Sequence, residues 1–176
     1  MCLVAILVSL SLAYGNSDVV LSQSSEGTPA KLIKFQGVEF AIPVDWTTEN
    51  AQNGLLIMCP KAEAGWQANI FVECRTENEP SRSLEKGLAD LATNLQTRKP
   101  HFEEINRKIA KTHDGLGYGT LQYSTEQDGT KLTESEIVFV LNDTKRLFIL
   151  ASSASAKLEK YTPIFNSLIN SVQPAK

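Results

Sequence analysis

Between residues 103 and 153, apolar and polar residues alternate with a period of two, and turn dipeptides interrupt the pattern at nearly even spacing. These dipeptides are Asp114-Gly115, Asp128-Gly129 and Asn142-Asp143. Strict alternation is typical of strands, and such dipeptides favour the positive φ values of two-residue hairpin turns. The pattern therefore predicts four consecutive antiparallel strands, over residues 103–113, 116–126, 131–141 and 145–153.

The predicted pairing sorts the side chains of these strands onto two faces. A two-residue turn at Asp128-Gly129 sets Tyr118 opposite Phe139. One face then carries Leu116, Tyr118, Ile137, Phe139, Leu141, Phe148 and Leu150, joined by Ile105 and Ile109. The other carries Gly117, Gly119, Leu121, Tyr123, Val138, Val140, Leu147, Ile149 and Ala151. A sheet that is apolar on both sides must be a middle layer, and its paired glycines suggest the close approach of a helix.

The rest of the chain supplies three further predicted strands and two helices. The strands cover residues 32–42, 54–58 and 66–75. The first helix begins near Pro80 and Ser81 or Ser83, carries the stripe Leu84, Leu88, Leu91 and Leu95, and ends before Pro100. The second covers residues 157–172 and is expected to restart at Pro163. This order predicts an α+β fold, an α/β/α sandwich around a central antiparallel sheet of about six to seven strands.

The N-terminus resembles a secretory leader. Residues 3–12 form an apolar run, and Ala13 and Gly15 place small residues before a cut at Asn16. We therefore predict a signal peptide over residues 1–15, a flexible linker over 16–31 and one domain over 32–176. The leader lacks Lys and Arg, which a mis-called start codon would explain, and a buried N-terminal strand is the alternative. The run is too short to span a bilayer, and Cys2 precedes it, so no lipobox follows. The predicted product is soluble and periplasmic or extracellular.

Charge and composition exclude several functional classes. The chain has 17 Lys and Arg against 20 Asp and Glu, with a pI near 5.5. Without a basic stripe, we expect no nucleic-acid partner. Gly117-Tyr118-Gly119 lies inside a predicted strand, where it indicates packing rather than a phosphate loop, and we expect no cofactor.

Few residues suggest chemistry, and each has a structural explanation. Cys59 and Cys74 are predicted too far apart for a disulfide if their strands form a hairpin, and Cys74 falls among core residues. His101 and His113 lack a companion at metal-ligand spacing. Glu134 and Glu136 are two apart on one side of a strand, where a solvated edge is expected instead of acid/base chemistry.

Asn142-Asp143-Thr144 is also a glycosylation sequon, which is meaningful only in a eukaryotic secretory route. Outside such a route it is simply the turn between two predicted strands. We therefore expect no catalytic or metal residue, and the sequence leaves the binding residues unknown.

Several segments resemble the PsbP-like/Mog-like superfamily, which includes the DcrB-type periplasmic proteins. They are the strand and Pro-x-x-Trp turn at residues 38–46, the Gly-x-Gly-Thr-x-x-Tyr hairpin at 115–140, the strand at 147–155 and the closing helix at 165–172. The closing helix has Val172 where Phe is usual. The resemblance implies an α/β/α sandwich and a non-enzymatic binding or assembly role, and it carries over no site residues.

Three functional hypotheses follow. The first is an exported binding or assembly protein that acts through protein–protein contacts, with a partner and oligomeric state that the sequence does not identify. The second is a toxin-immunity or chaperone-type partner protein. The third is a hydrolase that uses Cys74 or the pair Glu134 and Glu136. Membrane-spanning segments are not expected in any of them.

Overall fold

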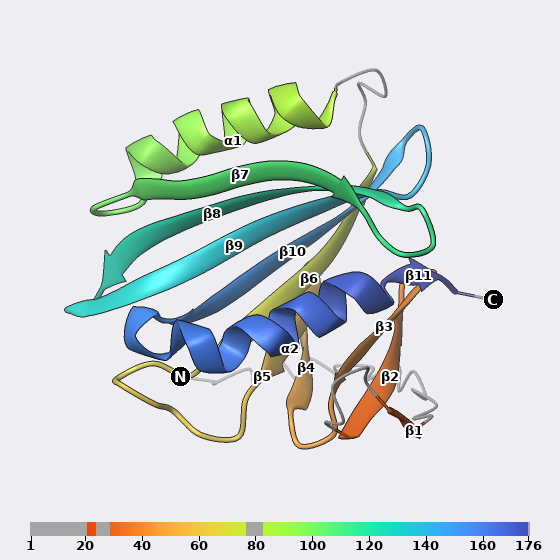
Figure 1. The fold of residues 1–176 in the computed structure, drawn as a ribbon, viewed down its shortest axis with the longest axis horizontal. Helices are drawn as coiled ribbons and strands as arrows, with labels where there is room; N and C mark the ends of the chain where they lie inside the picture. The colour runs from red at the N-terminus through yellow and green to blue at the C-terminus, as the bar shows by residue number, and fades with distance from the viewer. Residues whose placement is uncertain (1–20, 24–28, 77–82, 176) are drawn as a thin grey trace, which may run out of the picture.

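The structure is a computed structural model that describes residues 21–23, 29–76 and 83–175 (Figure 1). Its main element is an antiparallel sheet of seven strands in the order β4-β5-β6-β10-β9-β8-β7. The strands are β4 (Thr47–Ala51), β5 (Gly54–Met58), β6 (Asn69–Thr76), β7 (Glu103–Lys111), β8 (Gly117–Gln127), β9 (Thr130–Val140) and β10 (Lys145–Ala154). The predicted meander of four strands is confirmed as β7 to β10, and the predicted α+β sandwich is also confirmed.

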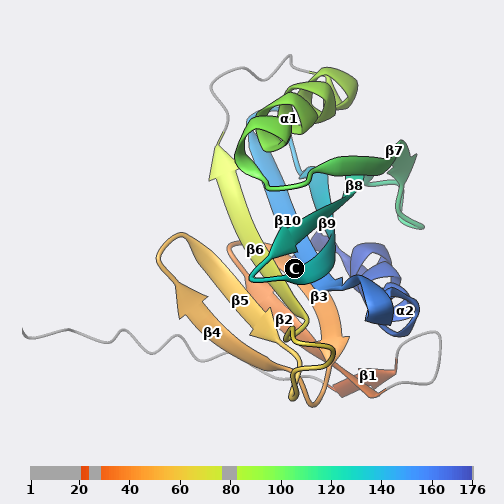
Figure 2. The ribbon, with the colours of Figure 1, turned by 90° about the vertical axis from the view of Figure 1, so that its left-hand side faces the viewer.

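Two helices lie on opposite faces of this strongly twisted sheet (Figure 2). Helix α1 (Leu84–Arg98) begins as predicted at Ser83, whose Oγ accepts a hydrogen bond from the backbone N–H of Lys86 at 3.2 Å. It buries Leu88, Ala92 and Leu95, while the alternative start residues Pro80 and Ser81 lie outside the described residues. Helix α2 (Leu158–Ser171) buries Tyr161, Phe165, Leu168 and Ile169 on the other face.

Helix α2 does not restart at Pro163, which corrects the prediction. A short 3₁₀ turn, η1 (Ser155–Lys157), precedes the helix, and Pro163 lies inside it. Proline there removes the hydrogen bond to the carbonyl of Glu159. Because Tyr161 and Phe165 anchor both sides of the proline in the core, packing outweighs that loss.

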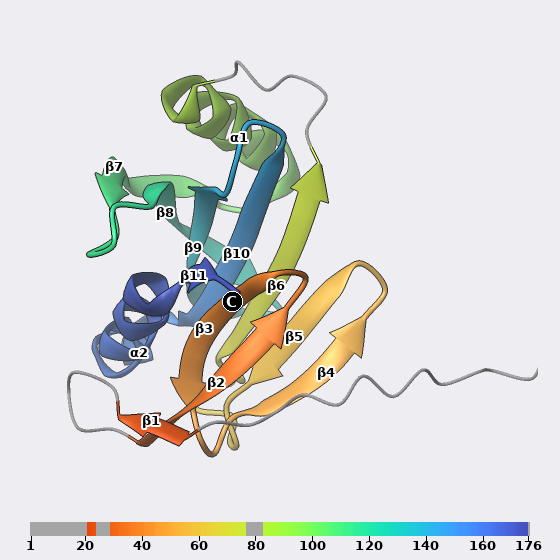
Figure 3. The same ribbon diagram turned by 90° about the vertical axis from the view of Figure 1, so that its right-hand side faces the viewer.

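A second, smaller sheet has the order β1-β2-β3-β11 and lies beside α2 (Figure 3). Its strands are β1 (Leu21–Gln23), β2 (Pro29–Phe35), β3 (Val38–Pro43) and β11 (Gln173–Pro174). The prediction of one strand over residues 32–42 was wrong, because Gln36 and Gly37 adopt φ values of 48° and 84° and turn the chain back. β1 and the start of β2 fall inside the range predicted as linker.

The small sheet helps α2 to cover one face of the main sheet. Ile33, Phe40 and Ile42 join a single core with Tyr161 and Phe165 of α2. The hairpin β4–β5 was missed as a pair because all five residues of β4 are polar or small and exposed. The predicted strand over residues 54–58 is confirmed as β5.

The register between β9 and β10 differs by one residue from the prediction. Arg146 pairs with Val140 and Leu147 with Phe139, so Asn142, Asp143 and Thr144 form a three-residue loop. The Asn142 Oδ1 accepts hydrogen bonds from the backbone N–H of Thr144 at 3.0 Å and of Lys145 at 2.8 Å, which holds the additional residue. Since one residue of slip exchanges the faces of a strand, the predicted face assignment within β10 was wrong.

The corrected register moves Leu147, Ile149 and Ala151 to the α2 face and Phe148 and Leu150 to the α1 face. The Asp128-Gly129 turn is the predicted two-residue turn, with Gln127 opposite Thr130. Asp114 and Gly115 instead lie in a second three-residue loop, which the Thr112 N–H closes by donating to the Leu116 carbonyl at 2.9 Å.

Strand β7 also departs from the prediction. Ile109 pairs with Gly119 and therefore belongs to the α1 face, and Ile105 lies at a bulge between Glu104 and Asn106. Both isoleucines are largely exposed, at 46% and 52%. The close approach expected at the glycines occurs at Gly119 alone, because a Cβ there would lie 2.8 Å from Leu88 Cδ1, while one at Gly117 would meet nothing within 4 Å.

Candidate functional site

Helix α1 covers only part of its face of the sheet. It packs over β7 and β8 at one edge (Figure 1), and its buried leucines meet Leu121, Tyr123 and Val138. Beside the helix, above β9, β10 and β6, the structure has a groove of ≈ 540 Å³. Pockets that bind small ligands or single side chains are of this order, about 300–1,000 Å³. The groove is therefore the candidate functional site.

The floor of the groove is an apolar row that crosses the strands. Glu136 of β9 pairs with Leu150 of β10, and Leu150 pairs with Phe71 of β6. Leu150 and Phe71 are only half-buried. A Cβ on Gly54 would lie 2.6 Å from the Phe71 ring, so the ring rests on the backbone of the neighbouring strand. The row is thus held in place yet remains open to solvent.

Glu134 lies just outside the groove, two residues before Glu136 on β9, where it pairs with the C-cap residue of α1. The Lys99 Nζ lies 2.6 Å from the Glu134 Oε2, and only 4% of the Glu134 side chain is exposed. On the same face, Tyr123 pairs with Glu134, and the Tyr123 hydroxyl is buried close to the Glu134 carboxylate. Burial, followed by the charges of Glu134 and Glu136, raises the pKa of Tyr123 above its usual range.

Glu136 lines the groove two residues further along β9. Burial, together with the neighbouring charge of Glu134, raises the pKa of the Glu136 carboxyl to about 7, although Lys99 and Arg75 act in the opposite direction. Glu136 makes no hydrogen bond or ion pair within residues 21–23, 29–76 and 83–175. The prediction that Glu134 and Glu136 form a solvated edge was therefore wrong, because Glu134 is buried beneath the end of α1 and Glu136 is shielded beside it.

Three arginines surround the groove. Arg75 lies 4.6 Å from the centre of the Phe148 ring and 2.7 Å from the Glu73 carboxylate. Arg146 is buried and donates a hydrogen bond to the Asn142 carbonyl. Arg98 is exposed in the last turn of α1, where a cation interacts favourably with the helix dipole.

The remaining sequence candidates lie apart from the groove. Cys59 and Cys74 are free thiols, and Cys74 packs against the α2-side core as predicted. Burial raises the pKa of the Cys74 thiol, which keeps it protonated. His101 and His113 lie at opposite ends of β7. Within the described ranges, no group of three or more His, Cys, Asp or Glu side chains is placed to hold a metal ion.

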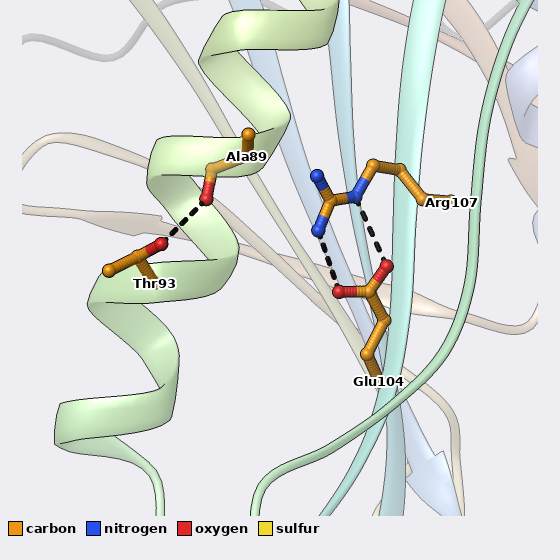
Figure 4. Close-up of polar contacts among 4 residues, drawn as sticks. All are labelled: Ala89, Thr93, Glu104 and Arg107. Carbon is orange, nitrogen blue, oxygen red and sulfur yellow. Dashed lines mark hydrogen bonds and ion pairs between the residues drawn. The ribbon is translucent and has the colours of Figure 1, made fainter.

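A second hollow lies between α1 and β7, and its two charged side chains are paired with each other (Figure 4). The Arg107 guanidinium donates two hydrogen bonds to the Glu104 carboxylate, at 3.1 and 2.7 Å. The Thr93 hydroxyl donates to the carbonyl of Ala89 at 3.1 Å. This hollow therefore leaves no unmatched charge, in contrast to the groove that contains Glu136. Sequence reasoning considered the Glu136 side chain but missed Lys99, Phe71 and Leu150, because helix α1 and the three-residue loop determine their positions.

Comparison with known proteins finds solved structures of similar fold. No protein-family model and no curated protein matches the chain. LpqN of Mycobacterium tuberculosis, a protein involved in cell envelope biogenesis, is similar with a TM-score of 0.63 and 13% identity over 92% of this chain and 93% of LpqN. Cyanobacterial PsbP of Synechocystis sp. PCC 6803 gives 0.58 and 16% over 95% and 98% of the two chains.

The Ran-binding protein Mog1p of Saccharomyces cerevisiae gives a TM-score of 0.56 and 6% identity over 92% of this chain and 97% of Mog1p. At these identities the likeness concerns the fold. Among the described residues, no helix is long and apolar enough to cross a membrane. The chain therefore has the PsbP-like/Mog-like fold that its sequence resemblance implied.

Proposed function

We propose that this chain is an exported, non-enzymatic binding or assembly protein that acts through protein–protein contacts. The observation that carries the proposal is the open part of the α1 face, where Phe71, Phe148 and Leu150 are half-buried beside the helix. Half-exposed apolar residues rimmed by charged ones are typical of interaction sites. The names of two structural neighbours, a Ran-binding protein and a protein of envelope biogenesis, support a role of this kind.

The non-enzymatic part of the proposal rests on the state of the candidate groups. Lys99 holds the Glu134 carboxylate in an ion pair. The Cys74 thiol faces the core on the side opposite the groove, with a raised pKa. A hydrolase needs a nucleophile or a base with a partner that activates it. Glu136 lines the groove with a carboxyl whose pKa is raised to about 7, which suits recognition of a charged group.

Site-specific photo-crosslinking in the producing cell tests this function. A photoreactive phenylalanine analogue would replace Phe71 in the groove, and Glu159, exposed on α2, would serve as the matched control position. We expect a discrete crosslinked protein from position 71, and loss of that product in a Leu150→Asp background. Equal crosslinking from both positions, or none from position 71, would contradict the proposal.

A toxin-immunity or chaperone-type partner protein is the second candidate, since either would also use an exposed apolar face. The identity of the crosslinked protein separates the two. A toxin or secreted effector as the crosslinked species supports the second candidate, whereas an envelope assembly component supports the first.

A further inference from the structure

Glu136 brings to the groove a carboxylate that forms no ion pair with the described residues around it. Glu134 and Glu136 both project from β9 onto the α1 face, where Lys99 contacts the Glu134 carboxylate. Lys99 pairs with Glu134 at 2.6 Å. Glu136 has no hydrogen bond or ion pair within the described ranges. When Glu136 is ionised, its charge is therefore unmatched.

The arginines around the groove have their described ion pairs and hydrogen bonds elsewhere. Arg75 acts on Glu136 electrostatically, but its guanidinium lies over the Phe148 ring and forms an ion pair with Glu73. The buried Arg146 is held by the carbonyl of Asn142. Arg98 is exposed in the last turn of α1, where a cation interacts favourably with the helix dipole.

A second observation points to the same place. The hydroxyl of Ser152 is buried without a hydrogen-bond partner in the part of the chain that the structure describes. Ser152 of β10 pairs with Glu134, two residues beyond the pair of Leu150 with Glu136 and on the same face of the sheet. Buried polar groups almost always have partners, so the sheet next to Glu136 has unused hydrogen-bonding capacity.

The body of the groove sets a second requirement on its occupant. Leu150 and Phe71 continue the row that begins at Glu136, and their exposed surfaces are apolar. Adjacent strands are about 4.8 Å apart, so an apolar group over Phe71 lies about 10 Å from Glu136. That distance is the reach of a lysine or arginine side chain together with one neighbouring residue.

We propose that Glu136 recognises a lysine or arginine side chain of the partner protein, whose neighbouring apolar residue lies over Leu150 and Phe71. This inference rests on the proposed function and adds the chemistry of recognition. Glu136 requires a cation, and the apolar row beside it requires an apolar neighbour of that cation. A partner segment that has both is distinguished from a surface that is merely basic.

Short capped peptides test the inference directly. The first probe is acetyl-Ser-Lys-Leu-Phe-Ser-amide, and the matched probe replaces its lysine with uncharged norleucine. Binding is measured at pH 8 by NMR shifts of the intact chain. We expect the lysine peptide to bind about tenfold more tightly, as for one hydrogen-bonded ion pair.

Three variants make the result specific. In Glu136→Gln the preference for lysine should fall to about one, because the amide cannot form the ion pair. In Glu126→Gln, at an exposed carboxylate near the end of β8, the preference should persist. In Phe71→Ser both peptides should weaken equally. A lysine preference that survives in Glu136→Gln would overturn the inference.

Two small amphiphiles distinguish other occupants. Tighter binding of n-octanoate than of n-octylammonium would identify a site for anions and overturn the inference. Binding of n-octylammonium without binding of the lysine peptide would indicate a free amine and would overturn the assignment to a protein segment. If the partner crosslinked at position 71 remains bound by Glu136→Gln, the inference fails while the proposed function stands.

Discussion

The Nζ of Lys99, the residue that caps the C-terminus of α1, lies 2.6 Å from the Oε2 of Glu134 in β9. Lys99→Met would leave the Glu134 carboxylate buried and unpaired. Because removing one partner of a shielded ion pair costs more than the pair contributes, we expect a loss of about 2–3 kcal/mol in the free energy of unfolding. Urea denaturation measures it.

Two controls accompany that substitution. Arg98→Met removes a neighbouring exposed cation and should change stability by less than about 0.5 kcal/mol. Adding Glu134→Gln to Lys99→Met should restore most of the loss. Equal effects of Lys99→Met and Arg98→Met would show that the Glu134 ion pair does not hold the end of α1.

Glu136 should make the stability of the fold depend on pH. Its pKa is raised from 4.5 to about 7 on folding, so the folded state holds the proton more tightly than the unfolded state. The resulting stabilisation is fully present below pH 4.5 and is lost as the pH rises through 7. This group alone should lower the free energy of unfolding by about 3 kcal/mol across that window.

The variant Glu136→Gln should remove that part of the pH dependence. It should be more stable than the wild type at pH 8 and close to it at pH 4.5, as measured by thermal unfolding at several pH values. Glu126→Gln, at an exposed position near the end of β8, should keep the wild-type slope. A steep slope that persists in Glu136→Gln would assign the titration to another group.

Gly119 and Gly117 form a matched pair for testing the packing of α1. Gly119→Ala would place a methyl group 2.8 Å from Cδ1 of Leu88, which is itself 1% exposed. Overpacking of this kind should cost about 1–2 kcal/mol. Gly117→Ala meets nothing within 4 Å and should be neutral or slightly stabilising. Similar losses in both variants would mean that backbone conformation, not Leu88, is the cause.

The register of β10 has a simple mutational test. Leu147 is fully buried among α2-side residues, whereas Phe148 lies half-buried on the groove side. Leu147→Ala should cost about 3 kcal/mol, and Phe148→Ala less than half of that, despite the larger side chain. Guanidinium denaturation of the two variants measures the order. A larger loss in Phe148→Ala than in Leu147→Ala would support the register that a two-residue turn predicts.

Export of the chain is open to a direct measurement. Expression from the full reading frame with its own N-terminus should yield a secreted or periplasmic product that begins at Asn16. Intact-mass determination locates the cut. A cytoplasmic product that retains residues 1–15 would contradict the predicted leader.

Sequence reasoning succeeded where local chemistry decides the structure. The strands on both sides of Asp128-Gly129 alternate cleanly, and both turn residues accept positive φ, so their register follows from the sequence. The same rule failed at Asn142-Asp143, because the Asn142 side chain itself accepts two backbone hydrogen bonds and enlarges the loop. That one residue decides which side chains of β10 form the groove.

Other differences have separate physical causes. Apolar residues occupy odd-numbered positions before Gly37, as at Ile33 and Phe35, and even-numbered positions after it, as at Val38 and Phe40. This change in the alternation indicates the hairpin between β2 and β3. The burial of Glu134 had no such signal. It depends on Lys99, which is 35 residues away in sequence and lies beside Glu134 only because α1 packs on the sheet.

The two helices are attached to the sheet very unequally. Helix α2 belongs to a continuous core that also includes the small sheet, whereas α1 is fastened by a separate cluster of few residues and by the ion pair at its end. Local stability follows the number of buried contacts, so the backbone amides of α1 should exchange with solvent before those of α2.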